Sequence, residues 1–380
     1  MKSLIKYMTV FVDRSVDPLS EQLIRKVVPP SATIVPLVDG HPSWIHYWEA
    51  TKGDAALDRV SADVKPLNRF TCFVTSKHLA CPDVSYALYA MKVPTLSLFA
   101  DKTTDIAMSP SPFFSDLATL QVAGIRDAIH SFFTFPETLG RLFVIEGGDG
   151  SGKETQTKLL VARLRKEGYR TETLDFPHDA APSGEVIREA LAGHCGTLTN
   201  LPKGSFALIY SFNRFERRSE LIYWVQRGVN VIVDRYTSAN FGYQLLNVEE
   251  GDRKDAVQKL INFEVDVLGL PGAHRVAYLQ LDPLQALMAI LQDDTRRELD
   301  MYEKYTVERK TDIMNLFKWC CTNLEGWTCV QSMEGDAAAG TRIPREVMHE
   351  TLFQLWQNEF VKPISHKEED SAATQQQQRE

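Results

Sequence analysis

Residues 142–176 decide the fold class, and they read LFVIEGGDGSGKETQTKLLVARLRKEGYRTETLDF. An apolar run leads into a glycine-rich loop, which is followed by a stretch of helical character and a second strand-like run. Further apolar runs, VNVIVD at 229–234 and RVAYLQL at 275–281, are typical of buried strands. Near-continuous apolar strands separated by helical stretches predict an α/β fold with a parallel sheet and helices on both faces.

The glycine-rich loop has the composition of a phosphate-binding loop. In such loops backbone N–H groups turn toward phosphate oxygens, and the next helix adds the partial positive charge of its N-terminus. A lysine supplies a cation for the β- and γ-phosphates. We expect ATP to bind here, and a glycine-rich turn without a ligand is the alternative. The expected ATP-binding residues are Gly147, Gly148, Asp149, Gly150, Ser151, Gly152, Lys153, Glu154 and Thr155.

Glu154 departs from the usual pattern, in which Ser or Thr follows the lysine and its hydroxyl reaches Mg²⁺. A carboxylate either replaces the hydroxyl as a magnesium ligand, since hard cations prefer oxygen, or repels the phosphates. The sequence leaves both open.

An acid and a base, Asp234 and Arg235, come directly after the apolar run at 229–234. In an open α/β sheet, ligands bind beyond the carboxyl ends of the strands. We therefore expect Asp234 to act near Mg²⁺ and Arg235 near an acceptor phosphate. A solvated pair in a turn is the alternative.

Five blocks of the sequence resemble the thymidylate kinase family, in the same order and at similar distances. They are FVIEGGDGSGK, LDFPHDAAPSGEVIREAL, LIYSFNRFE, VIVDRYTSANFGYQ and LPGAHRVAYLQLDP. The family has blocks of the form FEGxDxxGKST, FPxxxxxxG, LLFSANRWE, DRYxxSxxAYQ and LPKPDLxxxL. The resemblance implies a P-loop nucleoside monophosphate kinase that transfers the γ-phosphoryl group of ATP, with Mg²⁺, to dTMP and gives dTDP. It also implies a homodimer.

The resemblance assigns an acceptor site for a pyrimidine nucleoside monophosphate. In it Asp149 faces the sugar, Tyr210 stacks on the base, and Arg214 contacts base and phosphate. For Tyr210 a core aromatic is the alternative. The full acceptor set is Asp149, Phe176, Pro177, Tyr210, Arg214, Arg235, Tyr243 and Gln244.

The stretch 293–310 resembles the mobile lid of the family, where Arg296 and Arg297 are the candidates for clamping the transferring phosphates. An ordinary charged helix face is the alternative. The resemblance thus implies five catalytic residues, Lys153, Asp234, Arg235, Arg296 and Arg297, with Asp234 and Glu154 as metal ligands.

Three positions depart from the family, because Glu154 follows the lysine and Asp179 and Met301 stand where arginines are expected. These departures keep two alternatives open. One is a catalytically weak nucleotide-binding module with a regulatory or scaffold role, and the other is a kinase directed to UMP or CMP.

We expect the chain to divide into a small α/β domain over 1–136, the kinase-like domain over 137–363 and a disordered polar tail over 364–380. The first domain faintly resembles the nucleoside deoxyribosyltransferase and deoxynucleotide N-hydrolase family, on Tyr86-Ala87-Leu88 and the following KVPTL. The catalytic Glu of that family would fall at Ala87, so the resemblance implies a domain without glycosidic-bond chemistry. An unrelated α/β domain is the alternative.

The composition indicates which classes of partner and which cellular compartment to expect. The net charge of -8 argues against a nucleic-acid-coating surface, and no run of 18 apolar residues predicts a membrane span. The six cysteines form no CxxC pair, which argues against zinc and against a disulfide framework. We expect a cytoplasmic protein with reduced thiols.

Overall fold

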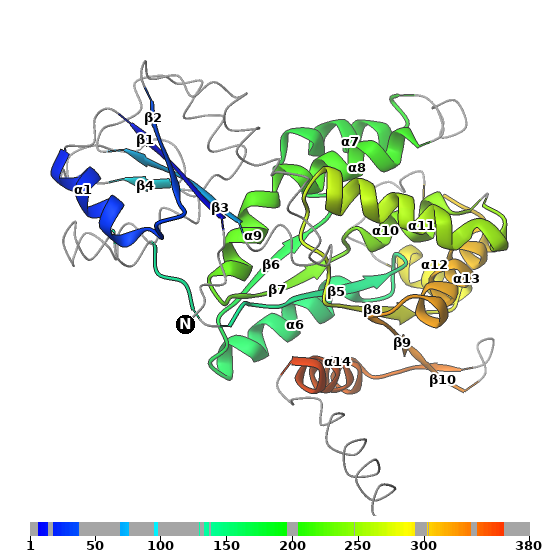
Figure 1. Ribbon diagram of the computed structural model, residues 1–380. Helices are drawn as coiled ribbons and strands as arrows, with labels where there is room; N and C mark the ends of the chain where they lie inside the picture. The colour runs from blue at the N-terminus through cyan, green and yellow to red at the C-terminus, as the bar shows by residue number, and fades with distance from the viewer. Residues whose placement is uncertain are drawn as a thin grey trace, which may run out of the picture.

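The structure is a computed structural model that describes residues 7–13, 18–37, 69–75, 95–97, 129, 133–136, 138–195, 204–246, 248–292, 302, 304–335 and 340–360. Its larger sheet has five parallel strands in the order β6-β7-β5-β8-β9 (Figure 1). The strands are β5 (Leu142–Gly147), β6 (Thr171–Asp175), β7 (Asn230–Asp234), β8 (Arg275–Gln280) and β9 (Trp327–Gln331). This confirms the predicted α/β fold, and β5 lies at the centre with the glycine-rich loop at its end.

Helices cover both faces of this sheet. They are α6 (Lys153–Lys166), α7 (Pro182–Ala192), α8 (Ser205–Glu216), α9 (Arg218–Gln226), α10 (Ser238–Gln244), α11 (Arg253–Ile261), α12 (Pro283–Leu291), α13 (Val307–Asn323) and α14 (Arg345–Phe360). A short 3₁₀ turn, η2 (Glu250–Asp252), precedes α11, and a π-helical segment, η3 (Asn262–Val267), follows it. Two short strands, β10 (Met333–Glu334) and β11 (Thr341–Arg342), form an antiparallel pair.

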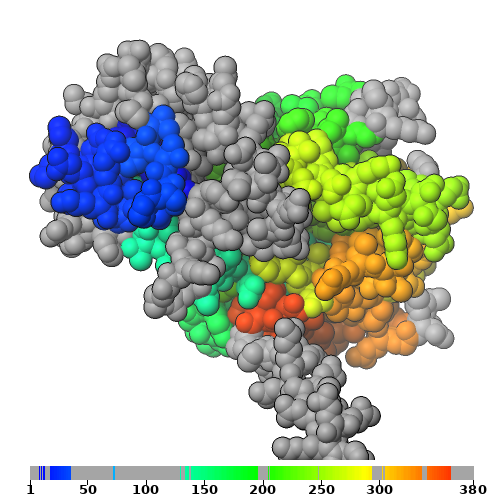
Figure 2. Space-filling view, in the orientation of Figure 1, coloured from blue at the N-terminus to red at the C-terminus, as the bar shows by residue number. Residues whose placement is uncertain are grey.

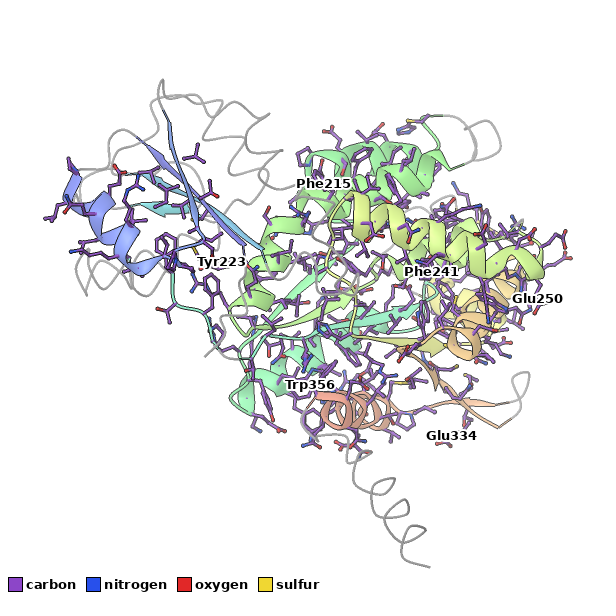
Figure 3. All side chains as sticks on the ribbon, in the orientation of Figure 1. Phe215, Tyr223, Phe241, Glu250, Glu334 and Trp356 are labelled. Carbon is purple, nitrogen blue, oxygen red and sulfur yellow. The ribbon has the colours of Figure 1, made fainter. Side chains whose placement is uncertain are left out.

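Alternating side chains of β5 build the two cores. Phe143 and Ile145 pack in one cluster with residues of α6 and α14, and that cluster includes Trp356 (Figure 3). Leu142 and Val144 belong to a second cluster with residues of α9. Because successive side chains of a strand point to opposite faces, every residue of β5 is buried. The glycine-rich loop therefore directly follows a strand that is packed on both faces.

The smaller sheet lies near the N-terminus and is also parallel, in the order β2-β1-β3-β4. Its strands are β1 (Tyr7–Asp13), β2 (Thr33–Leu37), β3 (Arg69–Thr75) and β4 (Thr95–Ser97), and α1 (Pro18–Val27) packs on it. Its described residues form a lobe at one end of the molecule (Figure 2). The core of this lobe includes Tyr223 of α9 (Figure 3), so α9 packs on both sheets. Tyr86, Ala87 and the tail over 364–380 lie outside the described residues.

His274, directly before β8, is expected to make the stability of the fold sensitive to acid. Its Nδ1 accepts a hydrogen bond of 3.0 Å from the backbone N–H of Leu142. Burial, assisted by the charge of Arg141, lowers the pKa of His274 to about 4. An unfolded histidine titrates near pH 6.5, so the unfolded chain takes up this proton first as the pH falls. The contribution of His274 to stability is present above that pH and is lost between about pH 6.5 and pH 4.

We expect the free energy of unfolding to fall by about 2 kcal/mol more in the wild type than in His274→Asn between pH 7 and pH 5. Asparagine keeps an acceptor for Leu142 and cannot be protonated in this range. Urea unfolding of both proteins at the two pH values measures the difference. Parallel pH dependences would show that folding does not lower the pKa of His274.

Among the helices that the structure describes, none is both long and apolar enough to cross a membrane.

Candidate active site

The glycine-rich loop is shaped for close contact between backbone and ligand. Gly150 has φ 78°, and a Cβ atom there would lie 2.7 Å from the carbonyl oxygen of Ala286. Any larger residue would therefore be both strained and obstructed. Helix α6 begins at Lys153 without a side-chain cap. Its first N–H groups can thus receive an anion.

Three charged side chains meet at the mouth of this loop. Arg235 Nη2 donates to Asp149 Oδ1 at 2.5 Å, and Lys153 Nζ lies 3.4 Å from the same oxygen. Burial raises the pKa of Asp149, but the charges of Arg235 and Lys153 outweigh it and hold that pKa well below its usual range. Asp149 is therefore ionised, and it holds both cations at the place where phosphates are expected.

Arg235 adopts an unusual backbone conformation directly after β7. Its φ is 61°, in the left-handed region that non-glycine residues rarely adopt. Its backbone N–H donates to the carbonyl of Ile145 at 3.0 Å, and Nη1 donates to the hydroxyl of Tyr243 at 3.1 Å. Strain of this kind persists when the surroundings determine the conformation, and it occurs preferentially at functional sites. Here it aims the guanidinium between the loop and α10.

Acidic groups collect beside Lys153. Asp234 is 9% exposed, and burial raises its pKa, with the charges of Asp175 and Glu154 acting in the same direction. Glu154 itself is largely exposed and accepts a hydrogen bond of 2.5 Å from Lys158. Within the described ranges, no group of three or more His, Cys, Asp or Glu side chains could hold a metal ion by itself.

A cavity of about 390 Å³ opens on the other side of Arg235. Its lining includes seven of the eight expected acceptor residues, namely Phe176, Pro177, Tyr210, Arg214, Arg235, Tyr243 and Gln244. The eighth, Asp149, lines a neighbouring cavity of about 510 Å³. Tyr243 and Tyr302 line both cavities, so the two spaces meet beside the Asp149–Arg235 pair. Residues from three of the five blocks thus line the cavity of about 390 Å³, and Asp149, from the glycine-rich block, lines the cavity beside it.

Comparisons with known proteins agree with this geometry. A family model described as Thymidylate kinase matches residues 145–323. The thymidylate kinase of Homo sapiens is 30% identical over 166 residues, which cover 44% of this chain and 69% of that protein. A probable thymidylate kinase of Methanococcus vannielii is 30% identical over 172 residues, which cover 45% of this chain and 74% of that protein.

The chain belongs to the thymidylate kinase family. Another relative, the thymidylate kinase of Danio rerio, is 29% identical and is matched over 77% of its length by 46% of this chain. A solved structure of thymidylate kinase from Candida albicans is 22% identical, with a TM-score of 0.43; the match covers 59% of this chain and 94% of that one.

In this member of the thymidylate kinase family, a buried ion pair with Glu264 holds Arg214 in place. Glu264, on the π-helical segment η3, accepts bonds of 2.7 Å and 2.6 Å from Arg214 Nε and Nη2. Both side chains are 1% exposed. Ser211 and Asn240 donate to Glu264 as well, so one carboxylate joins three helical segments beneath the cavity. The Nη1 group of Arg214 takes part in none of these bonds, and Arg214 lines the cavity.

Asn213, beside Arg214 on α8, fastens the wall formed by Phe176 and Pro177. Its Oδ1 accepts from the backbone N–H of His178 at 2.7 Å, and its Nδ2 donates to the carbonyl of the same residue at 3.1 Å. The Phe176–Pro177 peptide bond is cis. The adjacent asparagine and arginine of the NRFE block therefore act on the two sides of one pocket.

Two site residues were not anticipated from the sequence. Glu146, fully buried in β5, accepts from the backbone N–H of Gly147 at 3.0 Å and from the hydroxyl of Ser238 at 2.7 Å. An acid inside an apolar strand was a signal that could have identified it. Tyr302 packs on Tyr243 with ring centroids 4.9 Å apart, and it lies in the stretch assigned to the lid, where attention fell on the arginines.

Of the positions that depart from the family pattern, Asp179 is described by the structure and Met301 is not. Asp179 is 63% exposed and pairs with Arg188 of α7 at 2.7 Å, so an arginine is present beside that position. Arg296, Arg297 and Met301 lie outside the described residues, and their roles stay predictions.

Proposed function

We propose that this protein transfers the γ-phosphoryl group of ATP to the 5′-phosphate of dTMP, giving dTDP and ADP. The observation that carries the proposal is the Asp149–Arg235 contact of 2.5 Å, because it joins the phosphate loop to the cavity lined by the expected acceptor residues. Membership of the thymidylate kinase family supports dTMP as the acceptor.

The donor phosphates would lie over the start of α6. Among the residues that the structure describes, the hydrogen bonds of Lys153 are the long contacts of 3.4 Å with Asp149 Oδ1 and with the carbonyl of Gly148. It can exchange these weak bonds for phosphate oxygens at small cost. Phosphoryl transfer needs aligned reactants and neutralised charge more than covalent help from the protein. Lys153, together with the N–H groups of the loop, supplies both on the donor side.

The acceptor would occupy the cavity of about 390 Å³ with its 5′-phosphate toward Arg235. Tyr210 and Phe176 would border the base, and Asp149 would accept a hydrogen bond from the sugar. Arg235 then contacts the phosphate from which the attacking oxygen comes. Arg296 and Arg297 are proposed to close over the transferring group and to exclude water.

Magnesium fits the residues beside Lys153. Burial raises the pKa of Asp234, and the charges of Asp175 and Glu154 add to the rise. A divalent cation would stabilise the ionised form of this buried carboxylate. Mg²⁺ in kinases is commonly held by one or two carboxylates together with substrate phosphates, and Asp234 and Glu154 supply this number. When bound, the ion offsets the charge that develops on the phosphate oxygens. We therefore propose Glu154 as a replacement ligand for the usual hydroxyl.

Changing Glu154→Ala should raise the Mg²⁺ concentration needed for half-maximal turnover at least about tenfold, since a ligand is lost. Titrations of Mg²⁺ at saturating ATP and dTMP measure the effect. Lys158→Ala is the control, because it removes the partner of Glu154 and keeps the carboxylate. Higher turnover in Glu154→Ser than in the wild type would contradict a ligand role and identify Glu154 as a source of repulsion.

The acceptor is tested by ADP release with ATP·Mg²⁺ and each of dTMP, dUMP, UMP, CMP and AMP. Fastest turnover with dTMP supports the proposal. Fastest turnover with UMP or CMP would move the assignment to a different pyrimidine acceptor. Nucleotide binding without turnover on any acceptor would favour a regulatory or scaffold module.

We also propose that two copies pair through α8. Leu208 and Phe212 lie one helical turn apart on this helix, and they are 46% and 47% exposed. Exposed apolar side chains at this spacing suit a helical interface. Phe212→Asp should shift the mass in sedimentation experiments from the dimer toward the 43.0 kDa chain. A wild-type protein that sediments as a single chain at micromolar concentration would contradict the pairing.

A further inference from the structure

Glu146 is a fully buried acid at the point where the central strand β5 enters the glycine-rich loop. A carboxylate inside a core costs free energy unless its oxygens accept hydrogen bonds. Here each oxygen has one such bond. Oε1 accepts from the backbone N–H of Gly147 at 3.0 Å, and Oε2 accepts from the hydroxyl of Ser238 at 2.7 Å. One side chain thus connects the start of the loop to the start of α10.

The two residues bonded to Glu146 belong to different halves of the site. Gly147 opens the loop, and a Cβ atom there would lie 2.6 Å from Ser151 Oγ, so the backbone is closely packed at this point. Ser238 is 2% exposed and is the first residue of α10. The same helix ends with Tyr243 and Gln244, which line the acceptor cavity. A shift of the loop can therefore reach the acceptor side through Glu146.

A second link joins the loop to the far end of α10. Asp149 of the loop bonds to Arg235 at 2.5 Å, and Arg235 donates to the hydroxyl of Tyr243 at 3.1 Å. Burial raises the pKa of Glu146, and the positive charges of Arg235 and Lys153 act against the rise, so the two links also interact electrostatically. Attachment at both ends sets the direction of α10 as well as its position.

We propose that Glu146 is a positioning residue that couples the donor loop to the acceptor cavity, so that ATP at the loop holds α10 in the geometry that receives dTMP. This inference rests on the proposed function, which makes ATP the donor and dTMP the acceptor. Such coupling is reciprocal, so bound dTMP tightens ATP binding by the same factor. Ser238→Ala isolates it, because this variant cuts the link to α10 and leaves the bond to Gly147.

Hydrogen–deuterium exchange of the full chain, with and without a non-hydrolysable ATP analogue and Mg²⁺, tests the coupling without any acceptor. We expect the analogue to slow exchange in α10 about tenfold in the wild type and less than about twofold in Ser238→Ala. Protection of α6, which begins in the loop, should be equal in both proteins and shows that the analogue is bound. Thr171→Val is the matched control and should behave as the wild type, since it removes a buried hydroxyl at the start of β6, away from the loop.

Two further measurements separate positioning from a purely structural role. Glu146→Gln keeps an acceptor for Gly147 and supplies an N–H for Ser238, so protection of α10 should stay within about twofold of the wild type. Calorimetric titration with dTMP gives the same coupling as an affinity ratio. The analogue should tighten dTMP binding about tenfold in the wild type and less than about twofold in Ser238→Ala.

Three outcomes would overturn the proposal. Protection of α10 in Ser238→Ala equal to that in the wild type would show that the coupling does not pass through Glu146. Protection of α6 without protection of α10 in the wild type would show that the loop and the helix respond independently. Loss of the α10 response in Glu146→Gln but not in Ser238→Ala would assign it to charge and not to the two bonds. A failure of the dTMP assignment would appear in the acceptor assays, and the exchange test, which uses only the ATP analogue, would still decide the coupling.

Discussion

Arg235→Ala should lower kcat/KM for dTMP by about three orders of magnitude, which is the range for removing an arginine that stabilises a transferring phosphoryl group. The loss has two sources. The variant removes a cation from the acceptor phosphate, and it also breaks the bonds of 2.5 Å to Asp149 and 3.1 Å to Tyr243. Asp149 is then free to pair with Lys153 alone and to hold it away from the donor phosphates.

Steady-state kinetics with ATP and dTMP varied separately measures this effect. Arg25→Ala is the matched control, since Arg25 is an exposed arginine of α1, on the smaller sheet, and is paired with Glu21. Arg235→Lys should recover only part of the loss, because an ammonium group lacks the planar geometry that bridges Asp149 and Tyr243. If a folded Arg235→Ala variant lost less than about tenfold in kcat/KM for dTMP, Arg235 would have no role in phosphoryl transfer.

Glu264→Ala should destabilise the protein by about 3–5 kcal/mol, the cost of leaving a buried charge unpaired. Arg214 and Glu264 are both 1% exposed and are joined by two hydrogen bonds. Removal of the carboxylate also leaves Ser211 and Asn240 without their shared acceptor. Urea unfolding followed by circular dichroism measures the change in the free energy of unfolding.

Two further variants make the stability test specific. Asp179→Ala removes an exposed partner from a pair of similar length, and it should cost less than about 1 kcal/mol. The double variant Glu264→Leu with Arg214→Met replaces both charges by apolar groups and should recover much of the lost stability. A Glu264→Ala protein as stable as the wild type would show that this ion pair does not hold η3 and α8 together.

The strands and the loop could be predicted because their signals are local. The residues of β5, β7 and β8 form apolar runs, and the loop with Lys153 follows its strand directly. The fifth strand, β9, was not predicted. It has five residues, WTCVQ, of which only Val330 is buried, so it lacks both a long apolar run and a clear alternation.

The acceptor pocket could be predicted only through the resemblance, and its supporting contacts could not be predicted at all. Arg214 stands 50 residues before Glu264, and Arg342, which donates to the carbonyl of Gly150 at 2.7 Å, stands 192 residues after it. No local sequence pattern predicts such pairs, because neither partner is distinguished by the residues next to it in the sequence. The fold creates them by bringing α8 to η3 and β11 to the phosphate loop.

The central claim is that this site moves a phosphoryl group from ATP to dTMP. The most direct measurement is the transfer of label from γ-³²P-ATP to dTMP in the presence of Mg²⁺, with Lys153→Ala as the matched blank. The account predicts labelled dTDP from the wild type and none above background from the variant. Wild-type protein that binds ATP and dTMP but forms no labelled dTDP would contradict it.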